Sequence, residues 1–386
     1  MVDITQLQQA FHHTFSKSPR LFRAPGRVNL IGEHTDYNEG YVLPIALHFS
    51  TYVAGAARND RLVRVHSLDF NEQGEFNLDN PQPPHPGNWL NYVEGVARSL
   101  EAEGNQLSGA DLLIQSEVPI GGGLSSSAAL EISTGFALLN LAGLPVNRLA
   151  LAKAGQQAEH LYVGANVGLM DQLTSVFGHR NSALLIDCRS IEMMQIPLTY
   201  PGLSIVVCDT NVKHKLSASE YNTRRKECEQ AVEILKVHLP SIQALRDVTL
   251  EDFERLKIHL PEPLQKRCRH VITENARTLA AAYSLRNSEI DVMGKLMFES
   301  HESLKNDYQV SCAELDLLVD TAANISGVFG ARLTGGGFGG CTVNFVRNET
   351  IQLFRKTIET AYQKNFQLTP TLYVVETGNG VEEVEA

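Results

Sequence analysis

The chain of 386 residues carries 33 Lys and Arg against 44 Asp and Glu, which gives a formal net charge of −11. This acidic balance argues against nucleic acid or an anionic membrane as the main partner, because both recruit clustered basic side chains. Apolar residues make up 43% of the chain and charged residues 20%, a composition that excludes disordered proteins and small disulfide scaffolds. The length predicts two or three domains.

The N-terminal residues lack the basic region and apolar core of a signal peptide, and no apolar run reaches the length of about 18 residues that a membrane span needs. We therefore expect a soluble, cytoplasmic protein. The six cysteines are too far apart to form a CxxC motif, so we expect reduced thiols and no protein-ligated zinc.

The first half of the chain predicts a mixture of helices and strands. Apolar residues at positions 4, 7, 11 and 15 recur at helical spacing, so an amphipathic helix should open the chain. Short β-like runs broken by Gly and Asn predict strands between residues 20 and 79. The elements expected next are a helix over 89–100, a strand over 110–118, a buried helix over 125–142, a helix over 146–162 and a short helix from about residue 169.

The second half predicts long helices and a further sheet. Residues 219 to about 324 are mostly helical in pattern, with prolines at 240, 261 and 263 as breaks. Because strands and helices alternate in both halves, we predict two α/β or α+β domains with a boundary near residues 180–200. The strands expected in this half are 182–187, 203–209, 328–334, 341–346 and 372–376.

A glycine-rich turn joins the predicted strand at 110–118 to the helix that follows it. Gly121, Gly122 and Gly123 would let the backbone approach an anion closely, and the start of the helix near Ser125 offers unpaired N–H groups. The turn lacks the lysine of a Walker A loop. For the glycines alone, a strand-to-helix turn with serine caps is the favoured reading. The order of strand, turn and buried helix shifts the balance toward a phosphate site, and both readings stay open.

A second glycine-rich segment covers residues 335–340 and fits the pattern GxGxxG. An alternating strand pattern follows it rather than a helix, which argues against a dinucleotide-binding turn of the Rossmann type. Either the segment packs against another backbone or it closes over a ligand.

Polar side chains are concentrated in residues 23–38. Arg27 and Asn29 alternate with apolar neighbours, a pattern that predicts polar groups held in a half-buried strand. Glu33, His34 and Asp36 follow, and carboxylates of this kind can accept hydrogen bonds from several hydroxyls of a polyhydroxylated ligand. The alternative is a polar surface loop.

Together the three segments resemble the signature motifs of the GHMP small-molecule kinases, and residues 26–38 resemble the galactokinase family among them. The resemblance spans residues 23–345. It implies an α+β fold of two domains, the first like ribosomal protein S5 domain 2 over residues 1–190 and the second ferredoxin-like over 191–386. The active site would lie in the cleft between them.

The resemblance also implies an activity: phosphorylation by ATP of the anomeric hydroxyl of α-D-galactose, which yields galactose 1-phosphate and ADP as the first committed step of galactose use. It implies that Asp171 accepts the proton, that Arg27 is its partner, and that Ser127 and Glu159 hold Mg²⁺. The positions that match sugar contacts are Glu33, His34, Thr35, Asp36, Gly168 and Tyr221. Those that match nucleotide contacts are Gly121, Gly122, Gly123, Leu124, Ser125, Ser126 and Ser127, with Ser67 as a further candidate.

Two alternatives remain open at this point. One is a sensor with the same fold that binds galactose and ATP without turnover, although such a protein would not need Ser127, Glu159 and Asp171 together. The other is a different GHMP kinase, with N-acetylgalactosamine as the nearest competing substrate. The polar run 33–36 argues against mevalonate or homoserine, which lack a ring of hydroxyls. We expect galactose and MgATP as partners, and a monomer.

Overall fold

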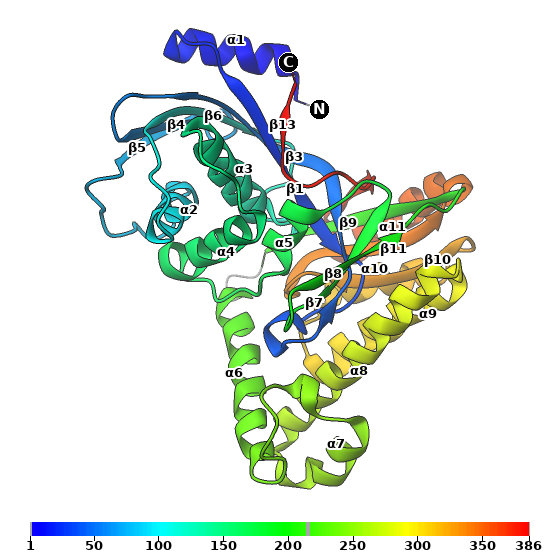
Figure 1. The fold of residues 1–386 in the computed structure, drawn as a ribbon. Helices are drawn as coiled ribbons and strands as arrows, with labels where there is room; N and C mark the ends of the chain where they lie inside the picture. The colour runs from blue at the N-terminus through cyan, green and yellow to red at the C-terminus, as the bar shows by residue number, and fades with distance from the viewer. Residues whose placement is uncertain (1, 214–216, 386) are drawn as a thin grey trace.

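Three β-sheets organise the chain, which the computed structural model describes over residues 2–213 and 217–385 (Figure 1). The largest has the order β13-β1-β3-β6-β4-β5, and β4 and β6 are parallel neighbours in it while the other pairs are antiparallel. Its strands are β1 (Arg20–Asn29), β3 (Pro44–Ala57), β4 (Leu62–Ser67), β5 (Glu72–Asn77), β6 (Ala110–Ser116) and β13 (Glu382–Val384).

Helices cover both faces of this sheet, because its strands carry apolar side chains on both faces. Val53 points into a core shared with four helices, whereas Tyr52 and Ala54 pack with Leu7 and Phe11 of α1 (Ile4–Phe15) on the opposite face. The four helices on the first face are α2 (Leu90–Ala102), α3 (Ser126–Leu141), α4 (Arg148–Ala158) and α5 (Met170–Phe177).

The second half is built on a four-stranded antiparallel sheet of order β10-β11-β9-β12. Val206 and Val346 on one face pack with the helices α10 and α11, whereas Val207 and Val343 on the other face join a core that also contains β1 residues such as Val28. This second core therefore connects the two halves. The strands are β9 (Leu203–Lys213), β10 (Val328–Thr334), β11 (Gly339–Arg347) and β12 (Thr371–Val375); the helices are α6 (Ser217–Lys236), α7 (Leu250–Leu256), α8 (Glu262–Arg286), α9 (Ile290–Ser303), α10 (Ala313–Ala323) and α11 (Ile351–Phe366).

A small antiparallel sheet, β2 (Tyr41–Val42), β7 (Ser182–Asp187) and β8 (Glu192–Pro197), lies where the halves meet. The chain then returns at its end to the first sheet: β13 pairs with β1, and Arg20 Nε lies 2.7 Å from Glu383 Oε1. The division into domains 1–190 and 191–386 remains a proposal, in which the last strand of the second segment belongs to the sheet of the first.

The sequence located most elements and missed the weakly patterned ones. The strands expected at 182–187 and 328–334 are confirmed, and the buried helix expected at 125–142 is α3. The helix expected over 146–162 is confirmed, with a change of type near its end, since α4 continues directly after Ala158 as a π turn, η2 (Glu159–Val163). The edge strand β8 was missed because it buries only one side chain, Ile196. The edge strand β5, which buries only Phe76, lies within the region of short strands expected over 20–79. No helix among the described residues is both long and apolar enough to cross a bilayer.

Candidate active site

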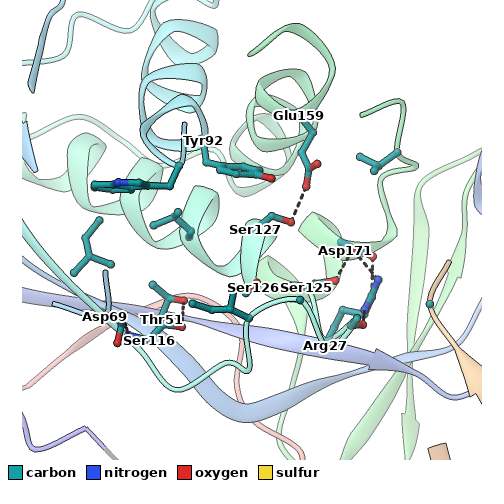
Figure 2. Close-up of a pocket in the computed structure, with 18 of the residues that line it drawn as sticks. Arg27, Thr51, Asp69, Tyr92, Ser116, Ser125, Ser126, Ser127, Glu159 and Asp171 are labelled. Atoms are coloured by element: carbon teal, nitrogen blue, oxygen red, sulfur yellow. Dashed lines mark hydrogen bonds and ion pairs between the residues drawn. The ribbon is translucent and has the colours of Figure 1, made fainter. Parts of the chain in front are cut away.

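Two cavities meet at a wall that contains Arg27 and Asp171. The first, which we call the α2 cavity, measures about 440 Å³ and is lined by Trp89 and Tyr92 from the start of α2 (Figure 2). The second, which we call the His34 cavity, measures about 600 Å³ and is lined by Glu33, His34 and Asp36 and by the glycine segment 335–340. The three polar or glycine-rich segments of the sequence therefore converge on one place.

The Arg27–Asp171 pair forms a two-pronged ion pair at this wall. Arg27 Nε donates to Asp171 Oδ1 and Arg27 Nη2 donates to Asp171 Oδ2, both at 2.8 Å (Figure 2). The Ser125 hydroxyl also donates to Oδ2. Arg27 is only 7% exposed, so the Asp171 carboxylate is held by a largely buried pair of charge-assisted hydrogen bonds. Asp171 itself lies in the first turn of α5.

The glycine turn is clamped against β1 and β11. Arg27 N donates to Leu124 O at 3.0 Å, and Cys341 Sγ donates to Gly122 O at 2.6 Å. Gly26 must lack a side chain, because a Cβ there would lie 2.5 Å from Leu124 O. The turn is thus fixed in place before any ligand arrives.

The serines that follow the turn do not cap α3. Ser125 precedes the helix with φ 56°, and its side chain makes no capping hydrogen bond to the first N–H groups. Instead, the Ser125 hydroxyl bonds to Asp171, and the Ser127 hydroxyl donates to Glu159 Oε1 at 2.8 Å. The serine-cap reading of this turn was therefore wrong, and the helix start keeps its donors for an anion at the edge of the α2 cavity.

Glu159 opens the π turn η2 and faces the α2 cavity across from Ser127 (Figure 2). Burial, with a further contribution from the nearby Asp171, raises its pKa to about 7, although the bond from Ser127 acts in the opposite direction. One carboxylate and one hydroxyl at an open cavity fit Mg²⁺, which in phosphate-transfer sites takes one or two protein ligands and keeps its other positions for phosphates and water.

Behind these groups, the three helices α3, α4 and α5 touch through a buried polar pair. Gln172 Nε2 donates to Glu131 Oε2 at 3.1 Å, and both residues are fully buried. Gly155 of α4 packs on the pair so closely that a Cβ there would lie 3.0 Å from Gln172 Cγ. Glu131 lies one helical turn after Ser127, Gly155 one turn before Glu159, and Gln172 next to Asp171. The pair therefore fixes the spacing of the three groups in front of it.

Glu33 is buried at the floor of the His34 cavity, with 2% of its surface exposed. Its Oε1 accepts a hydrogen bond from Gly335 N at 2.6 Å, and its Oε2 lies 2.9 Å from Nη1 of the completely buried Arg332. Burial raises the pKa of Glu33 although Arg332 acts to lower it. The carboxylate joins the loop after β1 to β10 and the glycine segment.

His34 and Asp36 present two different polar groups to the same cavity. Burial, together with the nearby His270, lowers the pKa of His34 to about 3, so this ring is neutral at physiological pH. Burial and the charge of Asp171 raise the pKa of Asp36 to about 6. A Cβ on Gly168 would lie 1.7 Å from Asp36 Oδ2, so glycine is required there.

Most of the residues matched by the resemblance line one of the two cavities, but three lie behind their walls. Ser67 lines the α2 cavity, and Tyr221 lines the His34 cavity. By contrast, Gly122 and Leu124 are not among the lining residues, and the Thr35 hydroxyl donates to backbone oxygens of Gly32 and Tyr41. These three shape the backbone that other residues present.

Sequence reasoning missed several aromatic and charged residues. Trp89 and Tyr92 were read only as one face of a helix, yet they line the α2 cavity beside Phe70, whose exposed fraction of 44% is unusual for its type. Arg332 could have been noticed as a lone charge within an otherwise buried strand. Tyr308 carried no signal, because its position depends on long-range packing.

Comparison with known proteins agrees with this geometry. Family models match the chain over residues 9–57 (galactokinase galactose-binding signature), 91–179 (GHMP kinases N terminal domain) and 281–362 (GHMP kinases C terminal). Galactokinases of Roseiflexus sp. and Chloroflexus aggregans are 45% and 49% identical, over 100% of this chain and 98% and 99% of theirs. The crystal structure of Lactococcus lactis galactokinase complexed with galactose is 36% identical and covers 99% of this chain and 100% of that chain, with a TM-score of 0.96.

These matches run the full length of the chain, and they include the motifs that form the two cavities. They also confirm the α+β fold with N- and C-terminal GHMP kinase domains. The chain belongs to the galactokinase family of the GHMP kinases, the enzymes that phosphorylate galactose with ATP.

Proposed function

We propose that the chain transfers the γ-phosphoryl group of MgATP to the anomeric hydroxyl of α-D-galactose, with Asp171 as the proton acceptor. The observation that carries this proposal is the position of Asp171 in the wall shared by the two cavities. ATP would occupy the α2 cavity and the sugar would occupy the His34 cavity. The γ-phosphoryl group and the anomeric hydroxyl would then meet at this carboxylate. Phosphoryl transfer requires mainly positioning and charge stabilisation of this kind.

The residues around the α2 cavity fit a nucleoside triphosphate. Trp89 and Phe70, whose ring centroids are 6.1 Å apart, offer an apolar surface for the base, and the start of α3 offers N–H donors for the phosphates. Ser127 and Glu159 would hold Mg²⁺. When bound, this ion supplies charge neutralisation on the phosphate oxygens. Aligned N–H groups and the ion would together replace the lysine that the turn lacks.

The two oxygens of Asp171 differ in what they already accept. Oδ2 takes Arg27 Nη2 and the Ser125 hydroxyl, while Oδ1 takes Arg27 Nε among the described residues. Because a carboxylate oxygen can accept two hydrogen bonds, Oδ1 retains room for the sugar hydroxyl. We assign Oδ1 as the atom that orients this hydroxyl and receives its proton.

The His34 cavity would recognise the sugar ring. Asp36 is mostly ionised above pH 6 and can accept hydrogen bonds from two hydroxyls, while the neutral His34 ring offers a nitrogen rather than a charge. Tyr221 places an aromatic ring 5.4 Å from that of His34, on the same cavity.

Identification of the product tests the proposal. Phosphorus NMR of the wild-type reaction with MgATP and galactose should show one phosphate ester, coupled to the anomeric proton. The Asp171→Asn variant should form it far more slowly. An ester on another sugar carbon would contradict the placement of the anomeric hydroxyl at Asp171.

A further inference from the structure

A buried tyrosine from the second half of the chain lies directly behind the His34 cavity. Tyr308 is completely buried, and its ring lies between two histidines, with centroids 4.7 Å from that of His34 and 4.5 Å from that of His270. It ends a π turn, η5 (Leu304–Tyr308). π turns are rare and concentrate at functional sites. The only other one in the described residues, η2, begins with Glu159 at the α2 cavity.

The hydroxyl of Tyr308 belongs to a buried chain of hydrogen bonds that ends on the His34 ring. Tyr308 Oη lies 2.8 Å from Tyr37 Oη, and Tyr37 Oη lies 2.7 Å from His34 Nδ1. At the other end, Cys228 Sγ lies 3.2 Å from Tyr308 Oη. His34 has φ 62°, in the left-handed region that few residues other than glycine adopt. Its unusual backbone and its ring orientation thus both depend on the surrounding contacts.

The same segment also supports the opposite wall of the cavity. Val310 O accepts a hydrogen bond from Phe338 N at 2.7 Å, and a Cβ on Gly337 would lie 2.3 Å from that oxygen. Arg224 of α6 donates to Tyr308 O at 2.9 Å, and its guanidinium lies 5.6 Å from the centre of the Phe338 ring. Residues 304–310 therefore contact both the His34 side and the glycine-segment side of the cavity.

We infer that Tyr308 is a positioning residue that determines sugar recognition: through Tyr37 it fixes the His34 ring, and its segment holds the glycine wall opposite. This inference rests on the proposed function, because it assigns the His34 cavity to the sugar. The segment does not line the α2 cavity. Loss of the Tyr308 hydroxyl should therefore weaken sugar binding and leave nucleotide binding intact.

The experiment compares Tyr308→Phe with Tyr362→Phe. Tyr362 is a matched control, because it is also completely buried and also donates through its hydroxyl, to Thr210 O at 2.8 Å, but it lines neither cavity. Galactose and ATP KM values are measured for both variants, and the galactose Kd is measured by calorimetry. Tyr308→Phe should raise galactose KM and Kd roughly tenfold and leave ATP KM unchanged, since the hydrogen bond that orients Tyr37 is lost. Tyr362→Phe should leave all three unchanged, although both variants lower the Tm.

Equal galactose Kd values for the two variants would overturn the inference, as would an equal rise of the ATP and galactose KM values in Tyr308→Phe. If Tyr308→Phe does not fold, Tyr37→Phe removes the middle hydroxyl of the same hydrogen-bonded chain. It should raise the galactose Kd and leave the ATP KM unchanged. The Tyr37→Phe/Tyr308→Phe double variant should bind galactose no more weakly than either single variant, because coupled residues are not additive. A wild-type protein that binds galactose without turnover would overturn the proposed reaction, and the Kd comparison would still decide the role of Tyr308.

Discussion

The α2 cavity and the His34 cavity share Asp171, but the chain builds them differently. The α2 cavity comes almost entirely from one continuous stretch, from β1 to α5, and its polar groups approach one another through short helix contacts. The His34 cavity is assembled from segments distant in sequence, the loop after β1, residues 163–171, α6 and the glycine segment 335–340. Its buried Glu33 is held by a long-range ion pair with Arg332. We expect the α2 cavity to tolerate substitutions in the second half of the chain. The His34 cavity should be disrupted by them.

Asp171→Ala removes the point where the two cavities meet and should have the largest effect. Loss of a proton acceptor lowers turnover by roughly 10²- to 10⁴-fold, so kcat should fall by that factor. ATP binding, measured by calorimetry, should persist because the helix start and Ser127 are untouched. Asp79→Ala, at an exposed side chain, is the control. A kcat within a few-fold of wild type would remove Asp171 from the reaction.

Glu33→Gln should damage the His34 cavity while sparing the α2 cavity. The substitution leaves Arg332 as a buried charge without its carboxylate partner, which costs about 3–5 kcal/mol in comparable buried pairs. Chemical denaturation should show this loss of unfolding free energy, and galactose KM should rise while ATP KM does not. Glu382→Gln provides a partly exposed ion pair with Arg23 as the control, with a much smaller expected loss. Unchanged stability in Glu33→Gln would mean that Arg332 has another partner.

Asp36→Asn should have the smallest effect, visible as a change of stability with pH. Asp36 has a folded-state pKa of about 6, raised above its usual value of 3.8. A raised carboxyl pKa contributes stability below the unfolded value, and that contribution is lost as the pH rises through the folded value. The Tm of Asp36→Asn relative to wild type, without sugar, should therefore increase between pH 4 and pH 7, by about 1 °C per kcal/mol because the entropy of unfolding scales with the 386-residue length. A pH-independent difference would mean that Asp36 is already ionised throughout that range.

The sequence predicted different amounts of the two cavities, and the α2 cavity was the easier one. The glycine turn, Ser127 and the start of α3 are consecutive, so the sequence alone brings the candidate phosphate contacts together, with a serine-capped turn as the alternative reading. The match of Asp171 to a family motif placed it correctly beside Arg27, which lies on a strand more than a hundred residues earlier. Local pattern failed at the serines, which bond to acidic side chains instead of capping the helix, and at Trp89 and Tyr92, which line the cavity.

On the sugar side, the sequence identified the lining residues but not what holds them. Glu33 and His34 stand out as polar residues, whereas their partners Arg332 and Tyr308 lie in a buried strand and at the end of a helix hundreds of residues later. Such partners are selected by packing in three dimensions, which no local spacing encodes. Both π turns were missed for a related reason, since periodicity does not distinguish a π turn from the end of an α-helix.

The measurement that tests the central claim most directly is ADP release by the purified protein with MgATP and a panel of galactose, glucose, mannose, N-acetylgalactosamine and mevalonate. If the His34 cavity selects the sugar and Asp171 joins it to the nucleotide, turnover should be confined largely to galactose and be lost in Asp171→Ala. Turnover with a different acceptor would show that the His34 cavity was assigned the wrong ligand. Galactose-dependent turnover that survives in Asp171→Ala would contradict the claim that the two cavities act through this carboxylate.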